Sequence, residues 1–391
     1  MKIRVISLFI ATPLSNMAPL NHCSTMFSFF KQKPKATAEV TFKTKVTQFW
    51  DWYGQVAPRF YETIEAKKCP SLAPEVSAKV NELFPFFAWE FGPGEGGIGH
   101  AFTLSGEGDA HRQLLTQFWL SQAPTLSGWT FYASRQPMYI RGHLLKMDEL
   151  DFDPIQFWLT PVVDREEEKV DITVWHPLFD QMQEKQRWTV LFLFLDQVMG
   201  EYGTGQWIGE INLNNARLAE SMPLHELNDF VKNLAMETGW KKYPPGEVWS
   251  VYSFEQPQNR FVRDDIVTGC TSHLKLLNDY LKAQGNLSDP LAGTGADYVF
   301  IAFAADSFPK GEESTTRGKL EDALGEPLKA AASGRLLGGA HGLQSGYIDL
   351  LLLDGRNSLD LVQKIIRDAA MPGHPSINFF AQEKRGWRIV I

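Results

Sequence analysis

The sequence predicts an α+β protein built from tandem ferredoxin-like (split βαβ) modules with antiparallel sheets. Segments with apolar residues at three- and four-residue spacing, typical of helices, alternate with short apolar runs typical of strands. The same order of elements recurs along the chain, and the last part has the β-α-β-β-α-β order of the split βαβ. The predicted divisions are module one at residues 41–145, module two at 150–257, a helical linker at 258–294 and module three at 295–391.

The composition describes a globular chain with enough apolar material for several cores. Its 391 residues are 44% hydrophobic, 13% aromatic and only 21% charged, a length that suits two to four domains of about 100 to 200 residues each. The net charge of −8 is spread out, without a Lys/Arg cluster of the kind that binds nucleic acid. No stretch approaches the roughly 20 apolar residues of a membrane-spanning helix. Nucleic acid and membrane partners are therefore not expected.

The cysteines indicate the cellular compartment. Cys23, Cys69 and Cys270 are far apart and odd in number, a pattern that fits neither a disulfide framework nor a metal-binding cysteine pair. Isolated thiols in a reducing, cytoplasmic compartment are therefore expected.

The amino terminus allows two interpretations. Lys2 and Arg4 precede an apolar run that is similar to a short signal peptide, so export is the alternative to the cytoplasm if residues 1–25 are cleaved. Met26 begins a segment typical of a natural start, and the shortness of the apolar run favours this second interpretation. In both cases residues 1–40 are expected to lie outside the fold.

Module one is expected to have the order α-β-β-α-β. Its opening helix carries one apolar side, and Pro58 is expected to bend or divide it. A second helix follows at 73–83, and an aromatic run and a second apolar run flank a glycine-rich turn as a hairpin. Asp109 is expected to cap the next helix, and a strand at 129–134 closes the module. The apolar side of the opening helix comprises Val46, Phe49, Trp50, Tyr53, Val56, Phe60 and Ile64.

Module two is expected to repeat this order after two initial strands. The predicted elements are strands at 156–163 and 170–174, a helix at 177–187, a strand at 190–195, a connection with Gly200, Gly203 and Gly205, a strand at 206–212, a helix from Pro223 and a strand at 249–254.

The two closing strands share a spacing that favours an internal duplication. Trp129, Tyr132, Gln136 and Pro137 recur at equal intervals as Trp249, Tyr252, Gln256 and Pro257. Side chains three apart on a strand point to opposite faces of the sheet. One member of each pair Trp129/Tyr132 and Trp249/Tyr252 is therefore expected in a core, and the other in a core or on a binding surface for a partner.

Module three follows a linker helix at 269–282 and a Gly/Ser/Asn/Pro-rich stretch at 284–295, which is predicted as the clearest domain boundary. Its predicted elements are strands at 298–304, 335–337, 347–353, 377–381 and 387–391, a helix at 317–333, and a helix capped by Asn357 or Ser358.

Each possible catalytic, cofactor or metal motif in the sequence has a simpler explanation as an ordinary structural feature. Gly92, Gly94 and Gly97 match the dinucleotide pattern G-x-G-x-x-G, but that site needs a helix to open at the loop, and a strand is expected here. Glycines also occur at the corresponding places of modules two and three, so a shared hairpin turn explains them better. Cys270 and His273 lack a second ligand pair. No metal and no cofactor are predicted.

Three carboxylates could act as an acid/base pair only if folding brings them together. Glu90, Asp196 and Glu201 are far apart in sequence, and solvated or capping roles are their ordinary alternative. A deep pocket lined by Glu90, His100, Glu201 or His341 would indicate an enzyme or a small-ligand binder.

The tryptophan-rich first helix followed by these modules resembles bacterial α+β families of unknown function, in which such a helix precedes ferredoxin-like modules. This resemblance implies no residue role. The repeated modules, the aromatic abundance and the lack of catalytic motifs predict a protein-binding or regulatory protein. The alternative is an enzyme or small-ligand binder with its site between modules.

Overall fold

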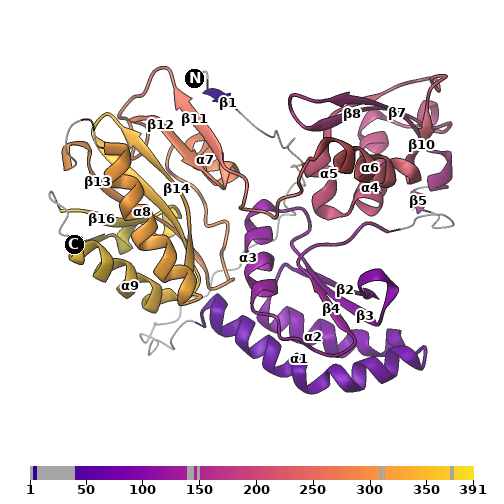
Figure 1. Cartoon of the computed structure of the whole chain (residues 1–391), viewed down its shortest axis with the longest axis horizontal. Coiled ribbons are helices and arrows are strands. Elements are labelled where there is room, and N and C mark those ends of the chain that lie inside the picture. Colours follow the sequence, from indigo (N-terminus) through magenta and orange to yellow (C-terminus); the bar gives the residue numbers. More distant parts are fainter. Residues whose placement is uncertain are drawn as a thin grey trace, which may run out of the picture.

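The structure is a computed structural model that describes residues 3–6, 40–138, 145–147, 150–307, 311, 313–369 and 374–391. It has mixed helices and antiparallel-rich sheets, which confirms the α+β class. Three units are visible in Figure 1: an N-terminal unit (residues 42–132), a middle unit (150–238) and a C-terminal unit (250–391). No helix in the described part of the chain has the length and apolar character needed to cross a bilayer.

The N-terminal unit has the element order that the sequence predicts. Its elements are α1 (Phe42–Glu65), α2 (Ala73–Leu83), β2 (Ala88–Pro93), β3 (His100–Ser105), α3 (Ala110–Ser121) and β4 (Trp129–Tyr132). The hairpin β2–β3 is antiparallel, and β4 lies parallel to β3. Pro58 was expected to bend or divide the first helix; it does not divide it, because α1 continues through it from Phe42 to Glu65.

The middle unit departs from its predicted order. Its strands β7 (Trp158–Asp164), β8 (Lys169–Trp175), β9 (Ile208–Leu213) and β10 (Met222–Pro223) form one sheet, with helices α4 (Glu184–Met199), α5 (Glu201–Trp207) and α6 (Leu227–Thr238). A separate pair, β5 (Leu145–Met147) and β6 (Leu150–Phe152), precedes them.

The strand predicted at 190–195 is wrong, because these residues form the middle of α4. A short apolar run cannot be assigned to a strand or a helix by periodicity alone. The deciding feature is local: Gln183 and Gln186 form a reciprocal capping box that starts the helix, and Gly200, at φ 76°, ends it. Gly203 and Gly205 lie in α5, so the hairpin predicted at this place is also wrong.

The C-terminal unit is one large antiparallel sheet with helices on both faces. Its elements are β11 (Ser250–Phe254), β12 (Ile266–Thr271), α7 (Leu274–Lys282), β13 (Asp297–Ala304), α8 (Glu313–Ala330), β14 (Gly334–Gly342), β15 (Ser345–Leu352), α9 (Gly355–Asp368), β16 (Ser376–Phe379) and β17 (Ile389–Val390). The strand order is β1-β11-β12-β14-β15-β13-β16-β17, where β1 is Ile3–Ile6. The predicted order β-α-β-β-α-β is present from β13 to β16.

Two predicted divisions look different in the folded chain. The strand predicted to close module two, β11, belongs to the C-terminal sheet, and the predicted linker 258–294 supplies β12 and α7 to the same unit. The equivalence of the two closing strands is therefore lost, since β4 pairs in parallel in a three-stranded sheet while β11 pairs antiparallel in the large one. The expectation that residues 1–40 lie outside the fold is wrong for Ile3–Ile6, because they pair with β11 as the edge strand β1 of the large sheet. Apart from β1 and Val40, the predicted leader lies outside the described residues.

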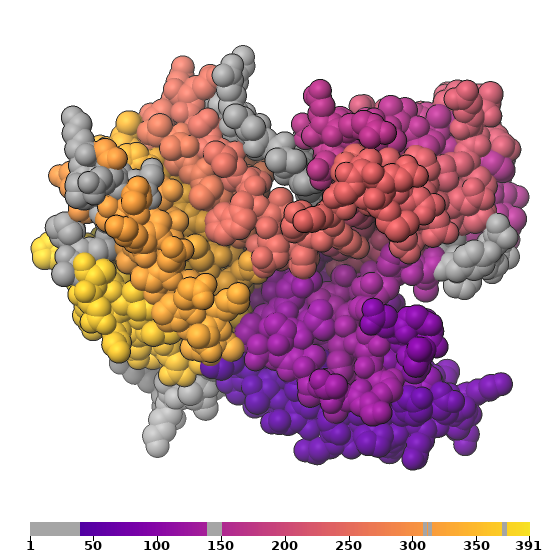
Figure 2. Space-filling model, in the orientation of Figure 1, coloured from indigo at the N-terminus to yellow at the C-terminus, as the bar shows by residue number. Residues whose placement is uncertain are grey.

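The N- and C-terminal units share one hydrophobic core, whereas the middle unit has its own. Aromatic side chains of α1, including Phe49 and Tyr53, belong to the same buried cluster as Phe300 and Leu351 of the large sheet. The middle unit's core contains only its own residues, and a third cluster lies between the sheet and helices α8 and α9. Figure 2 shows a recess between the N-terminal unit and the middle unit at the right of the view.

The predicted boundary at 284–295 is the place where the first helix docks on the C-terminal unit. The amide of Phe42 donates to the carbonyl of Gly295 at 2.9 Å, and that of Lys43 to Leu353 at 2.9 Å. Gly295 has φ +86°, and a Cβ there would lie 2.5 Å from the carbonyl oxygen of Val40. Glycine is therefore required for this close approach.

Candidate functional site

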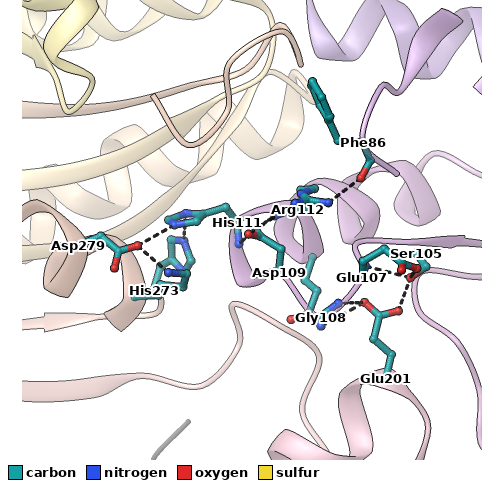
Figure 3. A network of polar contacts seen from close by, with 12 residues as sticks. Phe86, Ser105, Glu107, Gly108, Asp109, His111, Arg112, Glu201, His273 and Asp279 are labelled. Atoms are coloured by element: carbon teal, nitrogen blue, oxygen red, sulfur yellow. Dashed lines mark hydrogen bonds and ion pairs between the residues drawn. The ribbon is translucent and has the colours of Figure 1, made fainter. Parts of the chain in front are cut away.

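Residues 105–112, which connect β3 to the first turn of α3, are the place where all three units meet. Figure 3 shows that the side of this segment bearing His111 faces His273 and Asp279 of the C-terminal unit, while Ser105 and Gly108 face Glu201 of the middle unit. Two polar clusters, one on each side, form the candidate site.

The start of α3 is fixed locally. The Oδ1 atom of Asp109 accepts hydrogen bonds from the amides of His111 at 2.9 Å and Arg112 at 3.0 Å, as the sequence predicts. The Arg112 guanidinium donates to the carbonyl of Phe86 at 2.6 Å. Phe86 has φ 78°, an unfavourable conformation for a bulky residue, and this contact helps hold it there. The first turn of α3 is thus tied to the turn after α2.

The first cluster joins α3 to the C-terminal unit through two buried histidines. Nδ1 of His111 lies 2.8 Å from Nε2 of His273, which precedes α7, and the rings meet nearly at right angles. Nε2 of His111 lies 3.2 Å from Oδ2 of Asp279 on α7. The hydroxyl of Tyr298 on β13 lies 3.3 Å from His111 and 3.2 Å from His273. This group is named the histidine cluster below.

Burial and the neighbouring charges keep the ring of His273 neutral. Burial lowers the pKa of His273 well below its ordinary value, and the neighbouring His111 and Lys275 lower it further. Burial alone would raise the pKa of Asp279, but the hydrogen bonds from His111 and Lys275 outweigh it and lower that pKa to about 2. The ionised carboxylate of Asp279 accepts a hydrogen bond from Nε2–H of His111. Nδ1 of His111 is then free to accept from His273.

The second cluster joins α3 to the middle unit through Glu201. Its carboxylate accepts hydrogen bonds from the hydroxyl of Ser105 at 2.7 Å, the amide of Gly108 at 2.9 Å and the amide of Arg135 at 3.1 Å. Gln113 adds a longer contact at 3.4 Å. A carboxylate with these partners is a structural link between units, because its lone pairs are already engaged.

Folding brings the three carboxylates named in the sequence analysis into one neighbourhood, with Glu107 and Arg135. Arg135 pairs with Glu107 and lies 3.7 Å from Glu90. Burial raises the pKa of Glu90; Arg135 opposes this shift, and the charges of Glu201 and Glu107 reinforce it. Burial likewise raises the pKa of Asp196 to about 6, against a hydrogen bond from Thr204 and with reinforcement from Glu201. Sequence spacing gave no sign of this proximity.

Asp196 stands at the end of a groove of about 610 Å³ on the outer side of α4. Its side chain is exposed in part, and the surrounding chain removes enough of its hydration to raise its pKa. Trp188 and Phe192 stack in the groove with ring centroids 5.9 Å apart, and Leu193 beside them is 44% exposed. All the lining residues belong to α4: Glu184, Lys185, Trp188, Thr189, Phe192, Leu193 and Asp196. They are called the α4 surface below.

A second groove, of about 480 Å³, lies between α3 and α8. Leu114 and Phe118 of α3 line one side, Glu321 and Gly325 of α8 the other, and Arg335 donates to the carbonyl of Gly246 at 2.6 Å across it. Neither groove is lined by Glu90, His100, Glu201 or His341, the residues for which a deep pocket was considered.

The repeated aromatic residues are not brought together. Trp129 is partly buried, packs edge-on against Tyr53 and donates to the carbonyl of Ala57 at 3.3 Å. Tyr132 is also partly buried, at the end of β4. In the other sheet Tyr252 is 1% exposed and Trp249 is 44% exposed. The two pairs lie in different units, so they do not form one surface.

The glycine and metal patterns have structural explanations. The segment Gly92 to Gly97 turns between β2 and β3, and the strand that follows it has no helix amides to offer a pyrophosphate, which confirms the hairpin interpretation. Cys270 lies on β12 and His273 before α7, so the two residues do not share a helix, as their spacing of three would allow. Within the described residues, no three His, Cys, Asp or Glu side chains are arranged to hold a metal ion.

Sequence reasoning missed the histidine cluster entirely. His111 is separated from Asp279 by 168 positions and from Tyr298 by 187, so no spacing rule connects them. The one local signal was the capping residue Asp109, which predicts where α3 starts but not what it faces.

No protein-family model, curated protein or solved structure matches the chain.

Proposed function

We propose that this is a protein-binding, regulatory protein that engages its partner through the α4 surface. The observation that carries the proposal is the apolar outer side of α4. The helix already buries Val190, Leu191 and Phe194 in the middle unit's core. Trp188 and Phe192 are only partly buried at the edge of that core, and with the exposed Leu193 they line the groove. A helix that only covers a core carries polar residues on its outer side.

The size and residue types of the α4 surface support protein binding. Tryptophan and phenylalanine give a large contact area with few rotatable bonds to immobilise, and they are enriched at the energetic centres of interfaces. The surface is an open groove rather than an enclosed pocket, since one helix supplies all of its lining. A macromolecular partner suits such an open surface better than a small ligand, which needs concave enclosure.

Site-specific photo-cross-linking tests the proposal. A benzophenone amino acid at Leu193 in the full chain, irradiated in the native host, is expected to give one dominant adduct. The matched control places the same amino acid at Val162, which is 59% exposed on β7 of the same unit. Adducts of equal identity and yield at both positions, or none at position 193, would refute the proposal.

A second candidate, an enzyme or small-ligand binder, is favoured by the raised pKa of Glu90 and of Asp196. Carboxyls with raised pKa can donate protons near neutral pH, and they occur at catalytic sites. A Glu90→Gln variant that loses a chemical activity measured on the purified chain, with cross-linking at position 193 unchanged, would favour this candidate.

For the fold, we propose that β13 to β16 with α8 and α9 form a ferredoxin-like unit. Support comes from the β-α-β-β-α-β order and from the strand order β14-β15-β13-β16 with antiparallel neighbours. The proposal covers the C-terminal unit alone.

A further inference from the structure

The α4 surface has the form of a helix-packing site. Glu184, Trp188, Phe192 and Asp196 follow one another at four-residue intervals, and Lys185, Thr189 and Leu193 form a second row beside them. Side chains four apart on an α-helix make a ridge, and the groove between two such ridges receives a ridge of another helix. The concavity lined by these two rows is that groove.

The chemistry changes along the groove. Its centre is apolar, with the stacked rings of Trp188 and Phe192 and the exposed Leu193, and each end of the first row carries a carboxylate. Glu184 and Asp196 are separated by twelve residues, which is about 18 Å along the helix axis. A partner that buries its apolar side on the rings therefore meets a carboxylate near each end, with Lys185 beside Glu184 at one of them.

The end of the groove at Asp196 has further negative charges nearby. Glu201 and Glu107 act on the Asp196 carboxyl, and so does Arg135, a cation that is paired with Glu107 and lies close to Glu90. Lys185 is the single cation among the lining residues of the groove, against the two carboxylates. The field over the α4 surface thus favours a cationic partner.

We infer that the α4 surface binds an amphipathic α-helix of a partner protein, with Lys or Arg residues near both ends of its apolar stripe. This inference rests on the proposed function and names the class of partner. Two helices that pack through four-residue ridges cross at about −50°, and each ridge is inclined by about 26° to its own axis. The partner axis then departs from the Glu184–Asp196 row by only about 24°, within reach of long basic side chains at both ends.

Three labelled peptides of about 18 residues test the inference on the full chain by fluorescence anisotropy. The first has a leucine stripe flanked by lysines, the second carries glutamates in their place, and the third has the composition of the first with the stripe scrambled. The lysine peptide is expected to bind at least about tenfold more tightly than either of the others, which corresponds to about 1.4 kcal/mol.

Variants of the chain locate the binding. Leu193→Asp is expected to weaken the lysine peptide about tenfold or more, and Glu184→Gln/Asp196→Asn to reduce its advantage over the glutamate peptide to below about threefold. The charge-matched control is Glu220→Gln/Glu237→Gln, which removes two exposed carboxylates of the same unit away from the groove and is expected to change nothing.

Other outcomes overturn the inference. Equal affinity for the lysine and glutamate peptides removes the charge preference, and equal affinity for the scrambled peptide removes the helix. Concentration-dependent dimerisation that Leu193→Asp abolishes would identify a second copy of the chain as the occupant. If position 193 cross-links a partner while all three peptides bind alike, the proposed function stands and this inference fails; if position 193 captures nothing and no peptide binds, both fail.

Discussion

The imidazole rings of His111 and His273 meet across the N- and C-terminal units, with 2.8 Å between Nδ1 of the first and Nε2 of the second. Both residues are buried, and the pair is flanked by Asp279, Lys275 and Tyr298. One neutral histidine must donate and the other accept. An additional proton on Nδ1 of His111 would place two N–H donors face to face and a positive charge in a buried site, so the contact depends on the protonation state.

The stability of the folded chain is expected to fall as the pH drops below about 6.5. The pKa of His273 is lowered well below its ordinary value in the folded state, so between the two values the unfolded chain binds a proton that the folded chain does not. The contribution of neutral His273 to the free energy of unfolding is complete above the pKa of histidine in the unfolded chain. It is lost toward lower pH, at up to about 1.4 kcal/mol per pH unit. Urea unfolding from pH 7.5 to 4.5 measures it, and His273→Gln is expected to flatten the curve.

Two other groups must be separated from this effect. Burial lowers the pKa of His176 to about 4, which gives the same sign, so His176→Gln serves as the control in the middle unit. Asp196, whose pKa is raised to about 6, changes the stability with pH in the opposite direction, because here the folded chain binds the extra proton. An unchanged pH slope in His273→Gln would contradict the prediction.

Gly295→Ala is expected to destabilise the chain by at least about 2 kcal/mol, since a left-handed φ alone costs an L-residue about 1 to 2 kcal/mol. The added Cβ would also approach the carbonyl oxygen of Val40 to 2.5 Å, where α1 docks. Gly54→Ala inside α1 is the control: its Cβ meets nothing within 4 Å, and it should stabilise the helix by about 0.5 to 1 kcal/mol. Chemical denaturation distinguishes the two, and equal effects would argue against the close approach.

Asp349→Asn is expected to destabilise the C-terminal unit by about 3 to 5 kcal/mol, because it leaves the buried guanidinium of Arg263 without its counter-charge. Arg263 donates to both carboxylate oxygens of Asp349, at 2.5 and 2.9 Å, and lies between the rings of Phe300, Tyr347 and Phe380. The apolar double variant Arg263→Met/Asp349→Leu should recover most of the loss. Thermal unfolding measures both, and a double variant no better than the single one would count against this account.

Glu201→Gln is expected to loosen the link between α3 and the middle unit. The new amide places a donor against the donors Ser105, Gly108 and Arg135, at a cost of about 1 to 3 kcal/mol. Because the middle unit has its own core, the change should appear locally, as faster hydrogen exchange of the Gly108 amide. Glu220→Gln, an exposed position in the same unit, is the control, and equal exchange in both variants would refute the link.

Elements with a strong local signal were predicted well. The range 73–83 matches α2, Asp109 caps α3, and the glycine turn between β2 and β3 is a hairpin. The prediction fails at 190–195, where apolar residues extend around α4 from the core to the α4 surface: Phe194 is buried, Phe192 is partly buried and Leu193 is exposed. A periodicity rule expects one apolar side, so a helix whose apolar residues extend around it cannot be distinguished from a buried strand.

The sequence by itself determined the α+β class, the bounds of α2, the cap of α3 and the hairpin turn at Gly92–Gly97, because capping, turn chemistry and periodicity act between residues a few positions apart. The start of α9 was missed, since Asp354 and not Asn357 or Ser358 precedes it. Only the tertiary structure decided that β11 joins the C-terminal sheet, that the first and last units share a core, and that His111, His273 and Asp279 meet. Those contacts join residues more than 150 positions apart or depend on which sheet edge a strand finds. Burial and shape complementarity settle such choices, and neither is expressed in local spacing.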